Sequence, residues 1–189
     1  AADSNTAVSV LEGMQQYKSN SLNYVKGLEL TKVEPTFLTE VEYNTTDKSG
    51  FEKAKKAAKE ADVVVMVLGE HGFSSGEARS RTNLDLPGLQ QEFLEEIYKV
   101  NPNIVLVLNN GRPLTISWAA EKISTIVEAW QLGTETGNAV AQVLYGDYNP
   151  SGKLPMSFPR NIGQVPIAYN HYSTGRFTNK DNNVFWSHY

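Results

Sequence analysis

The sequence contains no cysteine, so disulfide bridges and thiolate metal sites are both excluded. Its three histidines, His71, His171 and His188, lie far apart without ligand spacing, and we expect neither a metal nor another cofactor. No stretch approaches the ~18 consecutive apolar residues of a membrane span, so no membrane partner is predicted. The first residues, Ala1–Ser4, do not form a signal peptide, and we expect the chain to be a fragment cut from a longer protein.

Positive charge is scarce as well. The chain has 17 basic and 21 acidic residues, a formal net charge of −4, whereas a nucleic-acid binder usually carries a basic stripe. The densest basic run, Lys53–Lys59, is interrupted by alanines and lies between Glu52 and Glu60, a pattern typical of a solvated helix face. We therefore predict no nucleic-acid partner.

Two common catalytic motifs are missing from the sequence. A Gly-x-Ser-x-Gly nucleophile elbow is absent, and so is a Walker phosphate-binding loop. Gly72–Gly76 resembles a phosphate cradle only loosely, because it lacks the Gly-Lys-Ser/Thr ending. These absences argue against serine-hydrolase chemistry and against P-loop nucleotide binding.

Apolar runs and amphipathic stretches alternate along the chain and predict its fold. The apolar runs are expected to be strands, at residues 63–68, 104–108 and 123–130. The amphipathic stretches are expected to be helices, at residues 50–61, 87–100 and 135–145, with a capping box of Ser49 and Glu52 before the first. Strands that alternate with helices favour right-handed crossovers and a parallel sheet. We therefore expect an α/β fold, a three-layer sandwich in which a mostly parallel sheet of about five to six strands has helices on both faces.

The extent of the domain also follows from the pattern. With 40% hydrophobic residues, a chain of 189 residues suits a single domain with one core. Residues 22–27 are a further candidate strand. Residues 160–189, rich in polar and aromatic residues, are expected to be an extended C-terminal arm of the same domain.

Polar loops follow the predicted strands, at the edge where parallel sheets meet their ligands. The loop after the first strand is the longest, and it carries two carboxylates, Glu70 at the strand end and Glu77 among glycine and serine. A loop glutamate can be merely solvated or ion-paired, but its position at a central strand end favours chemistry. Arg79 and Arg81 follow closely, and arginines against Glu77 would favour its ionised form, the opposite of what a proton donor needs.

Several segments resemble one known family. Residues 77–87 with Gln90 look like the acid/base loop of family 3 glycoside hydrolases, the β-glucosidase and β-xylosidase family. Residues 128–139 are similar to a second block that is characteristic of this family. Residues 146–160, Gly-Asp-Tyr-Asn-Pro-Ser-Gly-Lys-Leu-Pro-Met-Ser-Phe-Pro-Arg, give the most specific match. The resemblance extends over nearly the whole chain.

The resemblance implies a division of labour between two domains. In the family, an N-terminal (β/α)8-type barrel carries an aspartate nucleophile, and the α/β-sandwich domain that follows supplies the acid/base glutamate. This chain resembles the second domain only, and Glu77 matches the acid/base residue. Glu70, His71, Arg79 and Arg81 are then expected to be residues of the substrate loop or supporting residues behind it.

The function implied is that of a retaining β-glycosidase, first of all a β-glucosidase, which removes terminal non-reducing β-linked sugars. The implied partners are its own barrel domain and a β-linked oligosaccharide or glycoside, and the implied location is periplasmic or secreted. Because the nucleophile would lie in the barrel, we expect the 189-residue chain alone to be inactive.

Two other hypotheses remain open at this point. The chain could be a non-catalytic carbohydrate-binding or scaffold module that keeps the fold without the chemistry, although the Glu77 motif favours the enzyme. Fold logic alone would also allow a flavodoxin-like nucleotide or phosphate binder.

Overall fold

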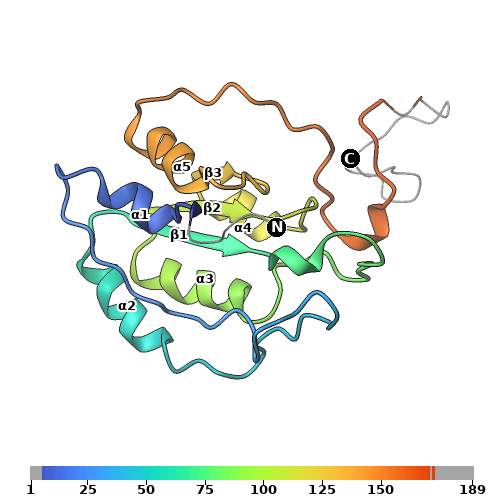
Figure 1. Ribbon diagram of the computed structural model, residues 1–189, viewed down its shortest axis with the longest axis horizontal. Helices are drawn as coiled ribbons and strands as arrows, with labels where there is room; N and C mark the ends of the chain where they lie inside the picture. The colour runs from blue at the N-terminus through green and yellow to red at the C-terminus, as the bar shows by residue number, and fades with distance from the viewer. Residues whose placement is uncertain (1–5, 171, 173–189) are drawn as a thin grey trace, which may run out of the picture.

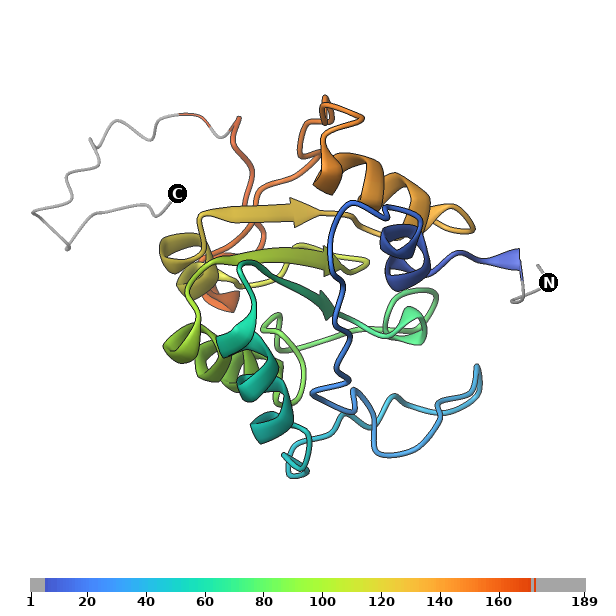
Figure 2. The ribbon, with the colours of Figure 1, turned by 90° about the vertical axis from the view of Figure 1, so that its left-hand side faces the viewer.

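A three-stranded parallel sheet forms the centre of the molecule, with helices on both of its faces (Figure 1). The strands lie in the order β1 (Val64–Gly69), β2 (Ile104–Asn109) and β3 (Thr125–Glu128). The computed structural model describes residues 6–170 and 172, and all three strands within them point the same way (Figure 2). The predicted α/β sandwich is confirmed, and the described residues hold three of the five to six strands expected.

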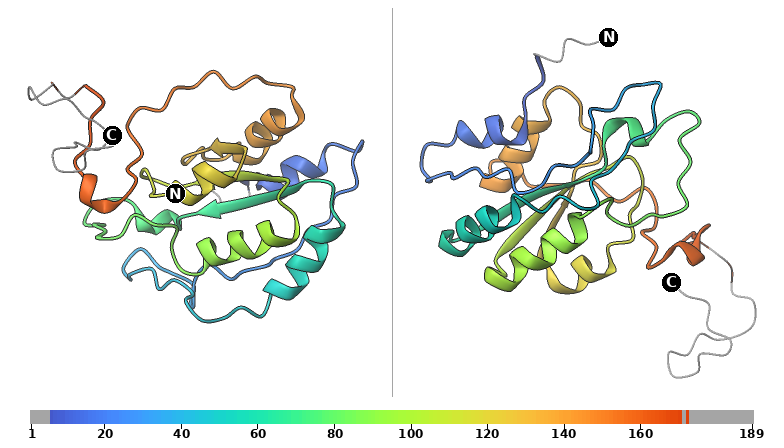
Figure 3. Two further views of the ribbon diagram at one scale, coloured as in Figure 1. Left: turned by 180° about the vertical axis from the view of Figure 1, so that it is seen from behind. Right: turned by 90° about the horizontal axis from the view of Figure 1, so that it is seen from below.

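Different helices cover the two faces of the sheet, as the right-hand view of Figure 3 shows. One face packs against α2 (Phe51–Glu60), α3 (Gln90–Val100) and α4 (Ser117–Lys122), and the other against α1 (Val10–Gln15) and α5 (Thr136–Tyr145). Side chains of a strand alternate between faces, so Leu106 and Leu108 enter the first layer while Val107 enters the second. Burial on both faces explains why β2 is a continuous apolar run.

The larger core lies between the sheet and the pair α2 and α3. The rings of Phe51 and Phe93 meet there with centroids 4.8 Å apart, and Leu94 and Ile97 are almost completely buried. Each such side chain stabilises the fold by about 1.5–3 kcal/mol through removal of apolar surface from water. This core fixes the positions of the strands and therefore of the points at which their loops begin.

The capping of α2 differs from the prediction. Gly50 is the N-cap of α2 and makes no side-chain capping bond, so the predicted capping box of Ser49 and Glu52 is wrong. The Ser49 N–H donates instead to the Asp47 carboxylate at 2.9 Å, and the Glu52 carboxylate pairs with Lys55 at 3.0 Å. Both members of the expected box therefore have other partners.

The other two predicted helices lie close to their expected bounds. Pro87 does not open α3, which begins only at Gln90, because the chain turns at Gly88 with φ +67°. The predicted stop of α5 is confirmed, since Gly146 adopts the left-handed conformation (φ +83°) that closes the helix. On α5 the chain buries Ala141 and leaves Ala139 exposed.

Residues 22–27 do not form the strand that the sequence suggests. They run as an irregular segment whose Val25, together with Leu28, packs against the larger core. A side chain at Gly27 would overlap the Phe93 ring, with its Cβ only 2.2 Å from that ring. A strand also needs a neighbour to satisfy its backbone groups, and no strand of the described residues lies beside this segment.

Beyond α5 the described chain is irregular apart from one 3-10 turn, η3 (Ile162–Gln164). It is held to the domain by the rings of Phe158 and Trp130, 5.8 Å apart, and by a bond from the Ser117 hydroxyl to the Arg160 carbonyl at 3.2 Å. The expected arm falls mostly outside the described residues, which exclude 171 and 173–189, and it stays a prediction. In the described part, every helix is too short or too polar to cross a membrane.

Candidate functional site

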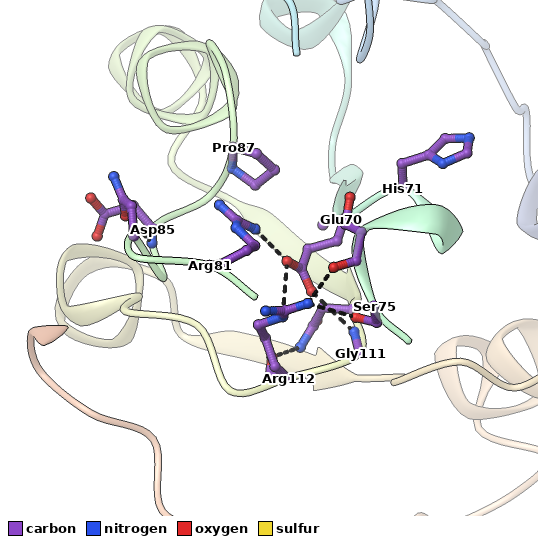
Figure 4. Close-up of polar contacts among 12 residues, drawn as sticks. Glu70, His71, Ser75, Arg81, Asp85, Pro87, Gly111 and Arg112 are labelled. Atoms are coloured by element: carbon purple, nitrogen blue, oxygen red, sulfur yellow. Dashed lines mark hydrogen bonds and ion pairs between the residues drawn. The ribbon is translucent and has the colours of Figure 1, made fainter. Parts of the chain in front are cut away.

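The polar loops that follow the strands meet at the carboxyl edge of the sheet (Figure 4). Glu70 directly follows β1, Gly111 and Arg112 follow β2, and Glu128 is the last residue of β3. The predicted gathering of the first two loops is confirmed by a hydrogen bond from the Gly111 N–H to Glu70 Oε2 at 3.2 Å. Residues 70–82, called the Glu77 loop below, rise from this edge.

Glu70 is the buried centre of the cluster. Its side chain has no exposed surface, and its Oε1 contacts Arg81 Nη1 in an ion pair and lies 3.4 Å from Arg112 Nε. A buried carboxylate is tolerated only where charges and hydrogen bonds compensate the loss of water, and here two guanidinium groups and one backbone N–H do so. Glu70 is therefore buried and paired below the loop, and its supporting role in a substrate site stays a prediction.

Arg112 extends this cluster into the loop above it. Its Nη2 donates to the Ser74 carbonyl, to the Ser75 hydroxyl at 3.2 Å and to the Arg79 carbonyl at 3.4 Å. One side chain thus holds residues on both sides of Glu77. We did not assign Arg112 a role from sequence, although an arginine at one strand end beside a carboxylate at the neighbouring strand end could have indicated it.

The two arginines of the loop bind other groups and leave Glu77 free. Arg81 pairs with Glu70, and Arg79 donates to the carbonyls of Phe37 at 2.6 Å and Thr39 at 3.0 Å. The expectation that both arginines lie against Glu77 is therefore wrong. The reason is geometric, because buried and backbone acceptors below the loop capture both guanidinium groups.

Glu77 itself is exposed and makes no hydrogen bond or ion pair with any residue that the structure describes. It stands between two residues of positive φ, Gly76 (+135°) and Ala78 (+58°). A left-handed alanine costs about 1–2 kcal/mol, and such strain persists only where the surroundings impose it. The contacts of Arg79 and Arg112 on either side supply that constraint.

His71 has a local structural role at the start of the loop. Its Nδ1 accepts the Phe73 N–H at 3.1 Å, which caps the short turn η2 (Gly72–Ser74), and its ring lies 5.3 Å from the Phe73 ring. Its own N–H donates to the Tyr43 hydroxyl at 3.4 Å, and that hydroxyl also bonds Ser74. The contact of His71 with a substrate stays a prediction.

A second carboxylate at the edge, Glu128, was not singled out as a site residue from sequence. Burial raises the pKa of Glu128, and the smaller opposing effects are the Trp130 N–H at 3.0 Å and the Asn110 amide at 3.5 Å. Trp130, like Ala78, has a positive φ (+49°). A charged residue at the end of an apolar strand is the sequence signal that could have indicated it.

Metal ligands do not gather in this part of the molecule. Among the residues that the structure describes, no group of three or more histidine and acidic side chains could hold a metal ion. The site instead consists of one exposed carboxylate on a loop that buried ion pairs hold in place.

This arrangement defines a class of protein: an α/β-sandwich domain that presents a carboxylate where parallel sheets bind their ligands. The sequence matches the Glycosyl hydrolase family 3 C-terminal domain over residues 1–188. The chain therefore belongs to glycosyl hydrolase family 3, as the resemblance in its motifs indicated.

Individual relatives agree with this assignment. The chain is 41% identical to a periplasmic beta-glucosidase of Salmonella typhimurium, over 100% of this chain and 26% of that protein. It is 43% identical to a beta-xylosidase of Formosa agariphila over 86% of this chain and 21% of that protein. The crystal structure of a beta-glucosidase from Listeria innocua in complex with isofagomine superposes with a TM-score of 0.81 at 33% identity, covering 99% of this chain and 24% of that one. The chain thus spans about a quarter of the length of these relatives.

Proposed function

We propose that this chain is the acid/base domain of a retaining β-glycosidase, and first of all a β-glucosidase, with Glu77 as the proton donor. The observation that carries the proposal is the exposed, unpaired Glu77 on a loop whose neighbouring residues are anchored to a buried ion cluster. An unpaired carboxylate is able to exchange a proton with a substrate. A merely structural glutamate in this loop would be expected to have a partner, as Glu70 does.

The reaction needs a second carboxylate that these residues do not supply. A retaining glycosidase attacks the anomeric carbon with one carboxylate and protonates the leaving oxygen with another, about 5–5.5 Å away. Water then hydrolyses the glycosyl–enzyme bond, with the donor now acting as base. In our proposal, a barrel domain of the same polypeptide brings the nucleophile, and the isolated chain is inactive.

The buried cluster gives the donor its position. Catalytic groups must be held to within about 0.5 Å of their productive place, which a flexible loop does not achieve alone. Glu70 and Arg81 join the two ends of the Glu77 loop, and Arg112 holds its middle through the Ser74 and Arg79 carbonyls. Glu70, Arg81 and Arg112 are thus positioning residues that act through the loop and do not touch the sugar.

Substrate and location follow from the relatives as proposals. The similar proteins are named as a beta-glucosidase and a beta-xylosidase, which supports β-linked glucosides first and xylosides second. That the sugar removed is the terminal non-reducing one is part of our proposal. A periplasmic or secreted location is supported by the Salmonella relative, whose name is periplasmic beta-glucosidase. In this proposal the partners are the barrel domain and the glycoside.

The test is the leaving-group dependence of the loss caused by Glu77→Gln in the polypeptide that carries the barrel. Turnover of a β-linked disaccharide should fall by about 10²–10⁴-fold, because its sugar leaving group must be protonated. The two substrates are compared by kcat/KM, which reports formation of the glycosyl–enzyme bond and not its later hydrolysis, for which Glu77 is the base. By this measure an activated aryl β-glucoside, whose aryl group departs as a stable anion, should lose far less. Glu60→Gln, an exposed residue at the end of α2, is the matched control and should change neither rate. Equal losses on both substrates would exclude the donor role.

A further inference from the structure

The outer edge of β1 has no strand beside it among the described residues. The N–H groups of Val64 and Glu70 point toward β2: they donate to the carbonyl of Asn103, just before β2, at 2.9 Å and to that of Asn109, its last residue, at 2.8 Å. Backbone groups alternate along a strand, so those of Val65 and Val67 point away from β2. Within the described chain they have no hydrogen-bond partner.

Of the residues that the structure describes, only Gln90 hydrogen-bonds to this edge, at its carboxyl end. The side-chain amide of Gln90 takes the place of a neighbouring strand there, because its Oε1 accepts the Gly69 N–H and its Nε2 donates to the Gly69 carbonyl, both at 2.7 Å. Two residues before Gly69, Val67 leaves 45% of its surface exposed although helices cover both faces of the sheet. An exposed apolar residue beside unpaired backbone N–H and C=O groups indicates a sheet edge that can pair with a further strand.

A groove of about 1310 Å³ runs along this edge. Residues 63–70 form one wall and residues 20–28 form the other, while Met14 of α1 and Phe93 of α3 reach it from the two faces of the sheet. Its opposite wall, which holds Val25 and Gly27, is the segment that fails to form the expected strand. Among the described residues, neither wall therefore has a hydrogen-bonded strand on the side that faces the groove.

We propose that a parallel β-strand of the same polypeptide, from outside these 189 residues, occupies the groove and pairs with Val65 and Val67. Because helices cover both faces of the sheet here, the strand should be about five to six residues long, continuously apolar and rich in β-branched residues. It would extend the sheet beyond β1 and give residues 22–27 the neighbour that they lack.

Two observations favour the same polypeptide over another molecule. The relatives of this chain are about four times its length, as its coverage of 24–26% shows, so further chain is present in them. In addition, the main chain at Val8 bonds Thr134 at 2.8 Å and Gly137 at 2.9 Å, and Ala7 and Val8 line the groove. The N-terminal segment therefore passes the groove directly, with no long linker needed. The proposal is independent of the role of Glu77.

Amide hydrogen exchange tests the proposal, measured on the 189-residue chain and on the polypeptide extended by its flanking coding sequence. In the extended polypeptide the Val67 amide should exchange at least roughly tenfold more slowly than in the shorter chain, since it gains a ladder hydrogen bond. The amide of Met66, which points toward β2, is the internal control and should be slow wherever the domain is folded. If the short chain does not fold, its Met66 amide also exchanges quickly. The test is then made in the extended polypeptide alone, where the proposal predicts that the Val67 amide is protected like that of Met66.

A proline substitution provides a second test of the proposed strand pairing. Val67→Pro removes the outward N–H and spares the pairing with β2, so it should lower the unfolding temperature of the extended polypeptide and leave the short chain almost unchanged. Met66→Pro should disrupt both. A Val67 amide in the extended polypeptide that exchanges as fast as in an unstructured peptide would overturn the proposal. Protection of Val67 in the short chain that rises with its concentration would do so as well, because it would assign the edge to a second copy.

Discussion

At Glu70 a single buried carboxylate satisfies two arginines that come from different loops. Electrostatics make this residue more important for stability than any exposed ion pair of the domain. Removal of one partner from a buried pair leaves uncompensated charge and costs about 3–5 kcal/mol, whereas exposed pairs contribute about 0–1 kcal/mol. The position of the Glu77 loop and the stability of the domain therefore depend on the same side chain.

Glu70→Gln should lower the free energy of unfolding by about 3 kcal/mol, because Arg81 and Arg112 then lack a negative partner. Urea denaturation measures this change. Glu121→Gln, which removes an exposed pair with Lys122, is the matched control and should change the free energy of unfolding much less, because water screens that pair. Equal effects of the two substitutions would show that the Glu70 cluster is not an energetic anchor.

Glu128 predicts a pH dependence of stability with a definite sign. Burial raises its pKa above the ordinary value of 4.5, so its protonated form is favoured in the folded state. Its contribution to stability is therefore complete below pH ~4.5 and is lost as the pH rises through the folded-state pKa. Relative to Glu128→Gln, the native chain should lose stability between acidic and neutral pH, as measured by denaturation at a series of pH values. A constant difference between the two proteins would contradict the assignment.

At the scale of elements, α1 and α5 approach each other at two glycines. A Cβ on Gly13 would lie 2.1 Å from the carbonyl oxygen of Gly137, so this helix pair tolerates no side chain at the crossing. The capping box that closes the first turn of α1, between Ser9 and Glu12, fixes where the helix begins. The pair covers the second face of the sheet, behind Val107 and Val127.

Gly13→Ala should destabilise the domain by about 1–3 kcal/mol, because the added methyl group forces α1 away from α5. Thermal unfolding followed by circular dichroism checks this value. Gly152→Ala is the control, since its Cβ would meet no atom within 4 Å and its effect should be close to zero. A neutral Gly13→Ala would mean that the two helices separate without cost.

The elements that sequence predicted well are those with a strong local signal. β1 and β2 are continuous apolar runs, and α5 ends in a left-handed glycine, so each carries its own pattern. The capping of α2 could not be predicted, because Asp47 competes for Ser49 through a local turn. The side-chain network at the site depends on contacts between residues about 40 apart in sequence, such as Arg112 with Ser74, which no periodicity reveals.

At the scale of the whole molecule, the domain has two surfaces that we propose contact other parts of a longer polypeptide. One is the Glu77 loop, which carries the exposed carboxylate that we propose as the proton donor, and the other is the edge of β1, which has no neighbouring strand among the described residues. Family motifs in the sequence predicted the first, whereas the second became visible only in three dimensions. In our proposals, both are completed by the remaining three quarters of a longer polypeptide.

The central claim is that this chain carries one half of a glycosidase site. It is tested most directly by hydrolysis of a chromogenic β-glucoside with the purified 189-residue chain, the barrel-containing polypeptide, and the Glu77→Gln variant of each. Because the barrel brings the nucleophile that a retaining mechanism needs, turnover should appear only in the barrel-containing polypeptide. The short chain should show none, with or without Glu77. Turnover by the short chain that persists through purification and disappears in Glu77→Gln would contradict the account.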